Sequence, residues 1–137
     1  MAHSLLLNHF SLAEQLALFA ALLFAIIHVY IFFLESIAWG RPKTNKLFGL
    51  RSAEEAAANR AFAFNQGFYN LFLALGTFAG LALMKAGYLA EGRTLVTFCA
   101  LSIFGAGVVL YFSTKNLRPA LIQAGPAFVY LVLSLVS

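Results

Sequence analysis

Seven polar side chains that could contact a ligand stand within long, otherwise apolar segments, and the histidine and the glutamate among them could also accept a proton. His28 and Glu35 are seven residues apart and so share one face of a helix, while Gln66 and Asn70, four apart, share a face of another. Amide and ionisable groups in apolar surroundings are costly unless they find partners. We therefore predict one cluster as a candidate ligand-binding site, with these members: His28, Glu35, Asn65, Gln66, Tyr69, Asn70 and Gln123.

The chemistry open to this set is narrow. It suits a polar-capped pocket for a lipophilic molecule with a polar head, or a proton acceptor at His28 or Glu35. A usual metal site needs about three or four protein ligands. This set holds one histidine and one glutamate, so no metal is expected. Ser36 is placed on a different helix face from Glu35, and Cys99 has no base near it in sequence. No catalytic residue and no cofactor follow from the sequence.

A second function of a different class fits the same residues. Intramembrane histidine and amide side chains often serve only to hydrogen-bond one helix to the next. The protein would then be a structural or accessory subunit of a membrane complex. The sequence leaves both hypotheses open, the small-molecule site and the packing role.

Composition shows which solvent surrounds these residues. Of 137 residues, 62% are hydrophobic and only 10% are charged, and the mean hydropathy is +0.86. A soluble domain would carry about 25% charged residues. The chain is therefore expected to be an integral membrane protein in contact with lipid. It carries no nucleic-acid-binding motif, and no nucleic-acid partner is expected.

The hydropathy pattern predicts an all-α, integral membrane four-helix bundle that forms a single domain over residues 1–137. The expected helices cover about 12–39, 52–85, 93–114 and 119–136. Trp39 next to Arg41 marks a membrane boundary, and Ser52 with Glu55 forms a capping box. Counting depth along the antiparallel first and second helices places Glu35 level with Asn65 and Gln66, and His28 level with Asn70.

Basic residues predict the orientation. Seven flank the first and third loops, while Lys85 and Arg93 stand alone on the other side. The positive-inside rule then places the first and third loops in the cytoplasm and both termini on the outer, periplasmic face of the cell inner membrane. The seven are Arg41, Lys43, Lys46, Arg51, Arg60, Lys115 and Arg118.

Three segments resemble a known family. HVYIFFLESIAWGRP (28–42), FNQGFYNLFLALG (64–76) and RPALIQAGPA (118–127) resemble the bacterial membrane proteins grouped as domain of unknown function 1304, which implies four spans. The layout is also distantly similar to the membrane-associated eicosanoid and glutathione metabolism family, with Arg60 and Asn65 at matching positions. No glutamate follows them as in that family's motif, so glutathione transfer is not implied. That likeness implies a homo-oligomer, with a trimer preferred.

Overall fold

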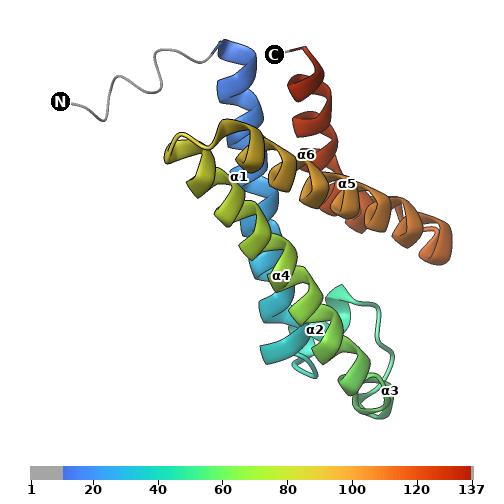
Figure 1. Ribbon diagram of the computed structural model, residues 1–137. Helices are drawn as coiled ribbons and strands as arrows, with labels where there is room; N and C mark the ends of the chain where they lie inside the picture. Colours follow the sequence, from blue (N-terminus) through green and yellow to red (C-terminus); the bar gives the residue numbers. More distant parts are fainter. Residues whose placement is uncertain (1–10, 137) are drawn as a thin grey trace.

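The computed structural model describes residues 11–136, and the regular structure within them is entirely helical. Its long helices are α1 (Leu12–Phe32), α4 (Arg60–Lys85), α5 (Leu89–Thr114) and α6 (Leu117–Leu135), and α1 continues as a π-helix, η2 (Phe33–Ile37). Two short helices, α2 (Pro42–Leu47) and α3 (Ala53–Ala58), lie in the first connection (Figure 1). The four long helical segments are apolar and long enough to cross a membrane. The predicted all-α, four-span class is confirmed.

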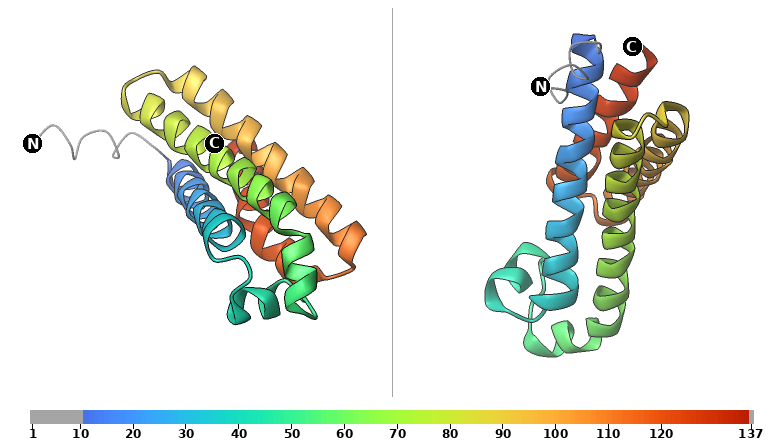
Figure 2. Two further views of the ribbon diagram at one scale, coloured as in Figure 1. Left: turned by 90° about the horizontal axis from the view of Figure 1, so that it is seen from below. Right: turned by 60° about the vertical axis from the view of Figure 1, so that its left-hand side comes forward.

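The helices form a closed ring in which each contacts two neighbours. α4 packs on α1 and α5, and α6 packs on α1 and α5. The start of α1, the end of α6 and the α4–α5 turn lie together at what we call the termini end, while α2 and α3 lie at the opposite, loop end (Figures 1 and 2). Residues 1–10 and 137, on which the predicted location of both termini depends, lie outside the described residues.

Small residues let α4 and α5 approach closely. A methyl group added at Gly80 would lie 2.9 Å from the carbonyl oxygen of Gly92, and one at Gly76 would lie 2.9 Å from the sulfur of Cys99. Gly76 and Gly80 are four residues apart, a spacing of small residues that permits close helix contact, and α5 is the helix that packs against them. The packed centre of the bundle is made of Ala17, Ala20, Ala21, Phe24, Val96, Ala100, Ile103, Ala127 and Tyr130.

Several predicted helix bounds differ from the structure. The first span ends at Ile37 rather than 39, and the third and fourth begin at Leu89 and Leu117 rather than 93 and 119. The expected continuous helix 52–85 is interrupted at Asn59. The reason is local, because the Asn59 side-chain amide donates to the Glu55 carbonyl oxygen at 2.9 Å and ends α3 there.

Candidate functional site

The site is built on the π-helical turn that ends the first span. The Ala38 amide donates to the Phe33 carbonyl oxygen, five residues earlier, at 2.8 Å, and this wider turn changes which side chains face α4. Glu35 and the next residue, Ser36, both lie against Gly67 of α4, where an added methyl group would meet Glu35 Cβ at 3.1 Å and Ser36 Oγ at 2.1 Å. The prediction that Ser36 occupies a different face was therefore wrong.

Two hydrogen bonds tie this turn to α4. The Ser36 hydroxyl donates to the Phe64 carbonyl oxygen at 3.0 Å. The Asn70 side-chain amide donates to Glu35 Oε2 at 2.8 Å and also to the Gln66 carbonyl oxygen at 3.1 Å. Glu35 is 9% exposed and Asn70 is 5% exposed, so this is an interhelical bond in the interior of the protein.

Glu35 Cβ lies against Gly67, the residue after Gln66, but its carboxyl accepts from Asn70, about one helical turn further along α4, and the depth count did not predict this bond. The count used main-chain rise and ignored side-chain direction. Helical side chains lean toward the N-terminus of their own helix. In this antiparallel pair Glu35 therefore leans toward the termini end and Asn70 toward the loop end, and the two side chains meet between their main-chain levels.

Beside this bond, the π-helical turn, the first connection and α4 enclose the loop-end pocket of about 510 Å³. Four of the predicted site residues line it, namely Glu35, Asn65, Gln66 and Tyr69. The other lining residues were not predicted as site members, and they are Trp39, Phe48, Leu50, Asn59, Phe62 and Ala63.

Trp39 fixes the wall that the first connection supplies. Its indole N–H donates to the Ala56 carbonyl oxygen at 2.8 Å, and its ring meets that of Phe48 edge to face, with centroids 5.2 Å apart. The tryptophan therefore holds α3 and the end of α2 against the mouth of the pocket. The sequence indicated Trp39 as a membrane-boundary residue, but contacts within an irregular connection have no periodic signal that would have predicted its partners.

Three predicted members do not line this pocket: Asn70, which bonds Glu35 beside it, His28 and Gln123. His28 is fully buried, its Nδ1 lies 2.8 Å from the Phe24 carbonyl oxygen, and its Nε2 has no hydrogen-bond partner within residues 11–136. Gln123 is half-buried on α6, which packs on α1 and α5. Arg60, at the start of α4, is exposed, and among residues 11–136 no ion pair joins it to Glu35.

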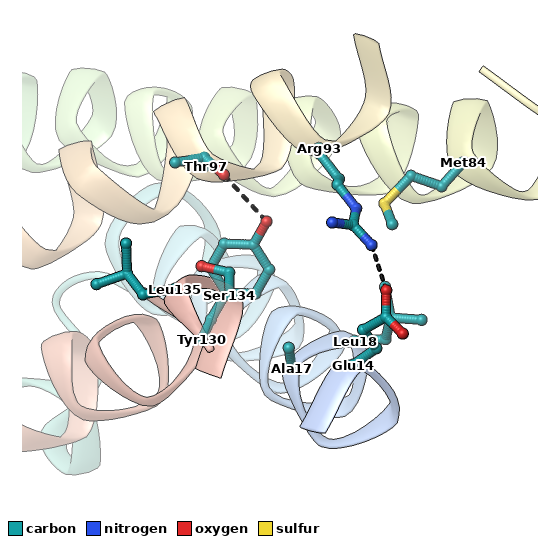
Figure 3. Close-up of a pocket in the computed structure, with 9 residues that line it drawn as sticks. All are labelled: Glu14, Ala17, Leu18, Met84, Arg93, Thr97, Tyr130, Ser134 and Leu135. Atoms are coloured by element: carbon teal, nitrogen blue, oxygen red, sulfur yellow. Dashed lines mark hydrogen bonds and ion pairs between the residues drawn. The ribbon is translucent and has the colours of Figure 1, made fainter. Parts of the chain in front are cut away.

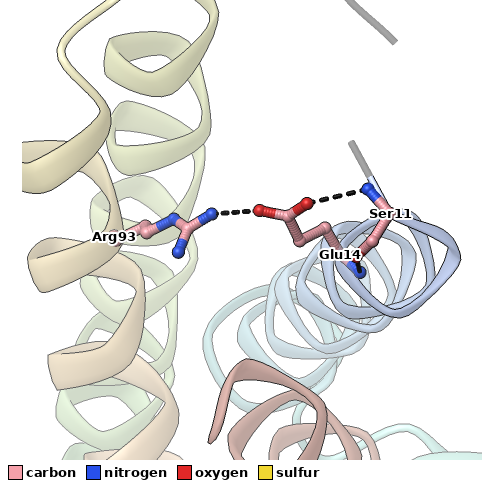
Figure 4. A network of polar contacts seen from close by, with 3 residues as sticks. All are labelled: Ser11, Glu14 and Arg93. Atoms are coloured by element: carbon pink, nitrogen blue, oxygen red, sulfur yellow. Dashed lines mark hydrogen bonds and ion pairs between the residues drawn. The ribbon is translucent and has the colours of Figure 1, made fainter. Parts of the chain in front are cut away.

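A second polar site, at the termini end, was missed. Glu14 of α1 forms an ion pair with Arg93 of α5 (Figure 4), and a pocket of about 200 Å³ opens beside them (Figure 3). Both charges were visible in the sequence, but Arg93 was treated only as evidence for orientation. Their opposite signs at the same end of two spans were a usable signal for this contact.

The arrangement at the loop end can hold an uncharged or amphipathic molecule between aromatic rings while amides and a carboxyl contact its polar part. No group of three or more His, Cys, Asp and Glu side chains within residues 11–136 is placed to hold a metal ion.

Comparison with known proteins confirms the family that the three sequence segments indicated. Residues 22–135, most of the chain, match a family described as "Protein of unknown function (DUF1304)". Neither a curated protein nor a solved structure matches the chain, so the likeness to the eicosanoid and glutathione family stays a prediction. The match covers α4, α5, α6 and the part of α1 from residue 22 onward, and the chain belongs to the DUF1304 family.

Proposed function

We propose that this protein is a multi-pass protein of the bacterial inner membrane that binds a lipophilic small molecule in the loop-end pocket. One observation carries the proposal: the buried Glu35 carboxyl, near the loop end of the first span, lines an open pocket whose other walls are mostly aromatic rings and amides. Placing a carboxyl at such a position costs stability. Hydrogen bonding between helices alone is served at lower cost by serine or threonine.

The lining indicates the chemistry of the ligand. Asn59, Asn65 and Gln66 can each donate and accept hydrogen bonds, and Glu35 adds an acidic group. The aromatic rings of Phe62 and Tyr69, both on α4, supply apolar contact. A volume of about 510 Å³ falls within the range of about 300 to 1,000 Å³ for small-molecule sites. A ring or short chain with a hydrogen-bonding polar head, as in a quinone-like molecule or a single-chain lipid, fits this lining.

We propose that the loop end faces the cytoplasm and both termini face the periplasm. The argument is the excess of lysine and arginine in the first and third loops. The loop-end pocket would then open in the cytoplasmic leaflet. Reporter fusions test this directly: a periplasmic reporter at Ser137 should be active, and an active cytoplasmic reporter there would reverse the topology.

We also propose that the protein is a homo-oligomer, with a trimer preferred by analogy of layout. Phe62 and Tyr69 support this, because they line the loop-end pocket and are 77% and 65% exposed, so that a neighbouring copy would cover them. Cross-linking in mild detergent should yield a discrete oligomer at low protein concentration. A monomer at every concentration would count against the proposal.

The alternative role, a structural or accessory subunit of a membrane complex, is favoured by a different observation. The Ser36 hydroxyl and the Asn70 amide each donate a hydrogen bond that joins the first span to α4. Such bonds are what polar residues supply when they serve only helix packing. This role predicts that no small molecule is retained after purification.

The deciding experiment compares two exposed aromatic residues on α4. Tyr69 lines the loop-end pocket, whereas Phe72, three residues on and 58% exposed, does not. Native mass spectrometry of the protein from mild detergent should show a co-purified molecule that Tyr69→Ala and Glu35→Gln lose and Phe72→Ala retains. His28→Ala, outside the pocket, should lower thermal stability without releasing it. An empty wild-type protein would favour the structural role.

A further inference from the structure

The termini-end pocket has a different lining from the loop-end pocket, and nothing in the proposed function uses it. Side chains from all four long helices surround this pocket, which has a volume of about 200 Å³. Figure 3 shows an ion pair on one side and a pair of hydroxyls on the other. The lining residues are Glu14, Ala17, Leu18, Met84, Arg93, Thr97, Tyr130, Ser134 and Leu135.

The acidic side chain in this pocket is already engaged at both oxygens. Glu14 Oε1 accepts from Arg93 Nη2, and Oε2 accepts from the Ser11 main-chain amide at 2.8 Å (Figure 4). The second bond belongs to the capping box that begins α1. Glu14 is 20% exposed, and its role toward any further molecule is limited because its acceptors are in use.

The basic side chain is only partly engaged. An arginine guanidinium carries five N–H donors in a rigid fork, and within residues 11–136 Arg93 donates only to Glu14. Its side chain is 43% exposed. Several directed donors with positive charge therefore remain beside the pocket. Arginine in this arrangement is suited to bind phosphate or carboxylate oxygens.

The opposite wall adds a further donor. Thr97 Oγ1 and the Tyr130 hydroxyl lie 3.1 Å apart and share one hydrogen bond. Two hydroxyls carry two protons and this bond uses one, so one proton is left to donate. Tyr130 is 3% exposed, and its hydroxyl is held in place. An acceptor-rich group between Arg93 and this pair would receive hydrogen bonds from both sides.

The level of the pocket identifies where such a group comes from. Glu14 is the third residue of α1, Arg93 the fifth of α5, and Ser134 the last but one of α6. These are the ends of spans, where a bilayer places its headgroups. Leu18 and Leu135 supply apolar surface beside the polar groups. We infer that this pocket binds the anionic phosphate headgroup of a membrane lipid, with Arg93 as its main donor.

Glu14→Gln gives the sharpest test. Glutamine still suits the capping box, but the change removes the charge that competes for Arg93. Short-chain phosphatidylglycerol titrated into the protein in neutral detergent, with bound lipid counted by native mass spectrometry, should bind about tenfold more tightly to Glu14→Gln than to wild type, the size expected for one charge-assisted hydrogen bond. Arg93→Gln should lose the binding, and the double variant Thr97→Val with Tyr130→Phe, which removes both hydroxyl donors, should weaken it several-fold.

Two further titrations distinguish the source of the anion. Phosphatidylcholine should bind more weakly than phosphatidylglycerol, and inorganic phosphate should not compete at equal concentration. Competition by inorganic phosphate alone would assign the site to the free anion and overturn the lipid. If Glu14→Gln leaves lipid binding unchanged while lowering stability, the ion pair is structural and the inference fails. The Glu14→Gln measurement gives this result even if Arg93→Gln does not fold. It has no bearing on the function proposed for the loop-end pocket.

Discussion

Gly67→Ala is the substitution that most directly tests how the π-helical turn packs on α4. The added methyl group would lie 2.1 Å from Ser36 Oγ and 3.1 Å from both the Ser36 main-chain nitrogen and Glu35 Cβ. Rotation of the hydroxyl relieves the first contact but breaks its bond to the Phe64 carbonyl oxygen. The other two contacts involve the main chain and a Cβ atom, so only a shift of one helix against the other relieves them.

The magnitude follows from three contributions. Losing the hydroxyl bond costs about 1 kcal/mol, and forcing extra volume into a packed contact costs about 1 to 3 kcal/mol. Replacing glycine by alanine within a helix returns about 1 kcal/mol. The free energy of unfolding of Gly67→Ala should therefore fall by about 1 to 3 kcal/mol relative to wild type.

Reversible unfolding by denaturant in mixed micelles measures this change. Gly105→Ala is the matched control, because Gly105 also lies within a long helix and an added methyl group meets nothing within 4 Å. It should be neutral or slightly stabilising. In a Ser36→Ala background the cost of Gly67→Ala should shrink, since the nearest contact is gone. This packing would be refuted if Gly67→Ala had the same free energy of unfolding as the wild type. It would also be refuted if the substitution lowered that free energy equally with and without Ser36→Ala.

Three further substitutions probe separate contacts. Asn70→Ala leaves the Glu35 carboxyl buried without its amide donor, so unfolding free energy should fall by about 1 to 3 kcal/mol, and by less when Glu35→Ala is already present. Trp39→Phe removes the bond to the Ala56 carbonyl oxygen and should speed limited proteolysis of residues 40–59, whereas an unchanged cleavage rate would contradict the bracing role. Gly92→Ala would place a methyl group 2.5 Å from a carbonyl oxygen of α4, so it should destabilise the protein more than Gly67→Ala in the same denaturant assay.

The candidate site residues that the structure brings together in one pocket are mostly those that follow helical periodicity. Asn65, Gln66 and Tyr69 lie along one stretch of α4 and do line a pocket together with Glu35. A count of spacing is sufficient there, because an uninterrupted helix fixes relative direction. The spans themselves were predicted for the same reason, since about 20 apolar residues are needed to cross a bilayer.

The parts that failed depend on contacts between segments. The π-helical turn depends on hydrogen bonds to the fifth residue back, such as that from Ala38 to Phe33, and on the space that Gly67 leaves for Ser36. Neither feature has a spacing pattern in the sequence. The contributions of Trp39 and Phe48 depend on the path of an irregular connection. Arg93 lies four residues inside its helix because α5 starts at Leu89, so the error in one helix bound concealed its contact with Glu14.

His28 is the predicted site residue that lies deepest in the packed interior of the bundle, away from both pockets. A carbonyl oxygen can only accept, so the bond to Phe24 places the ring proton on Nδ1 and leaves Nε2 as an acceptor. That acceptor is fully buried and has no donor within residues 11–136, a cost of about 1 to 3 kcal/mol. His28 lines neither the loop-end pocket nor the termini-end pocket. Its role therefore lies in the packed interior, whereas the two proposed binding sites use Glu35 at one end of the bundle and Arg93 at the other.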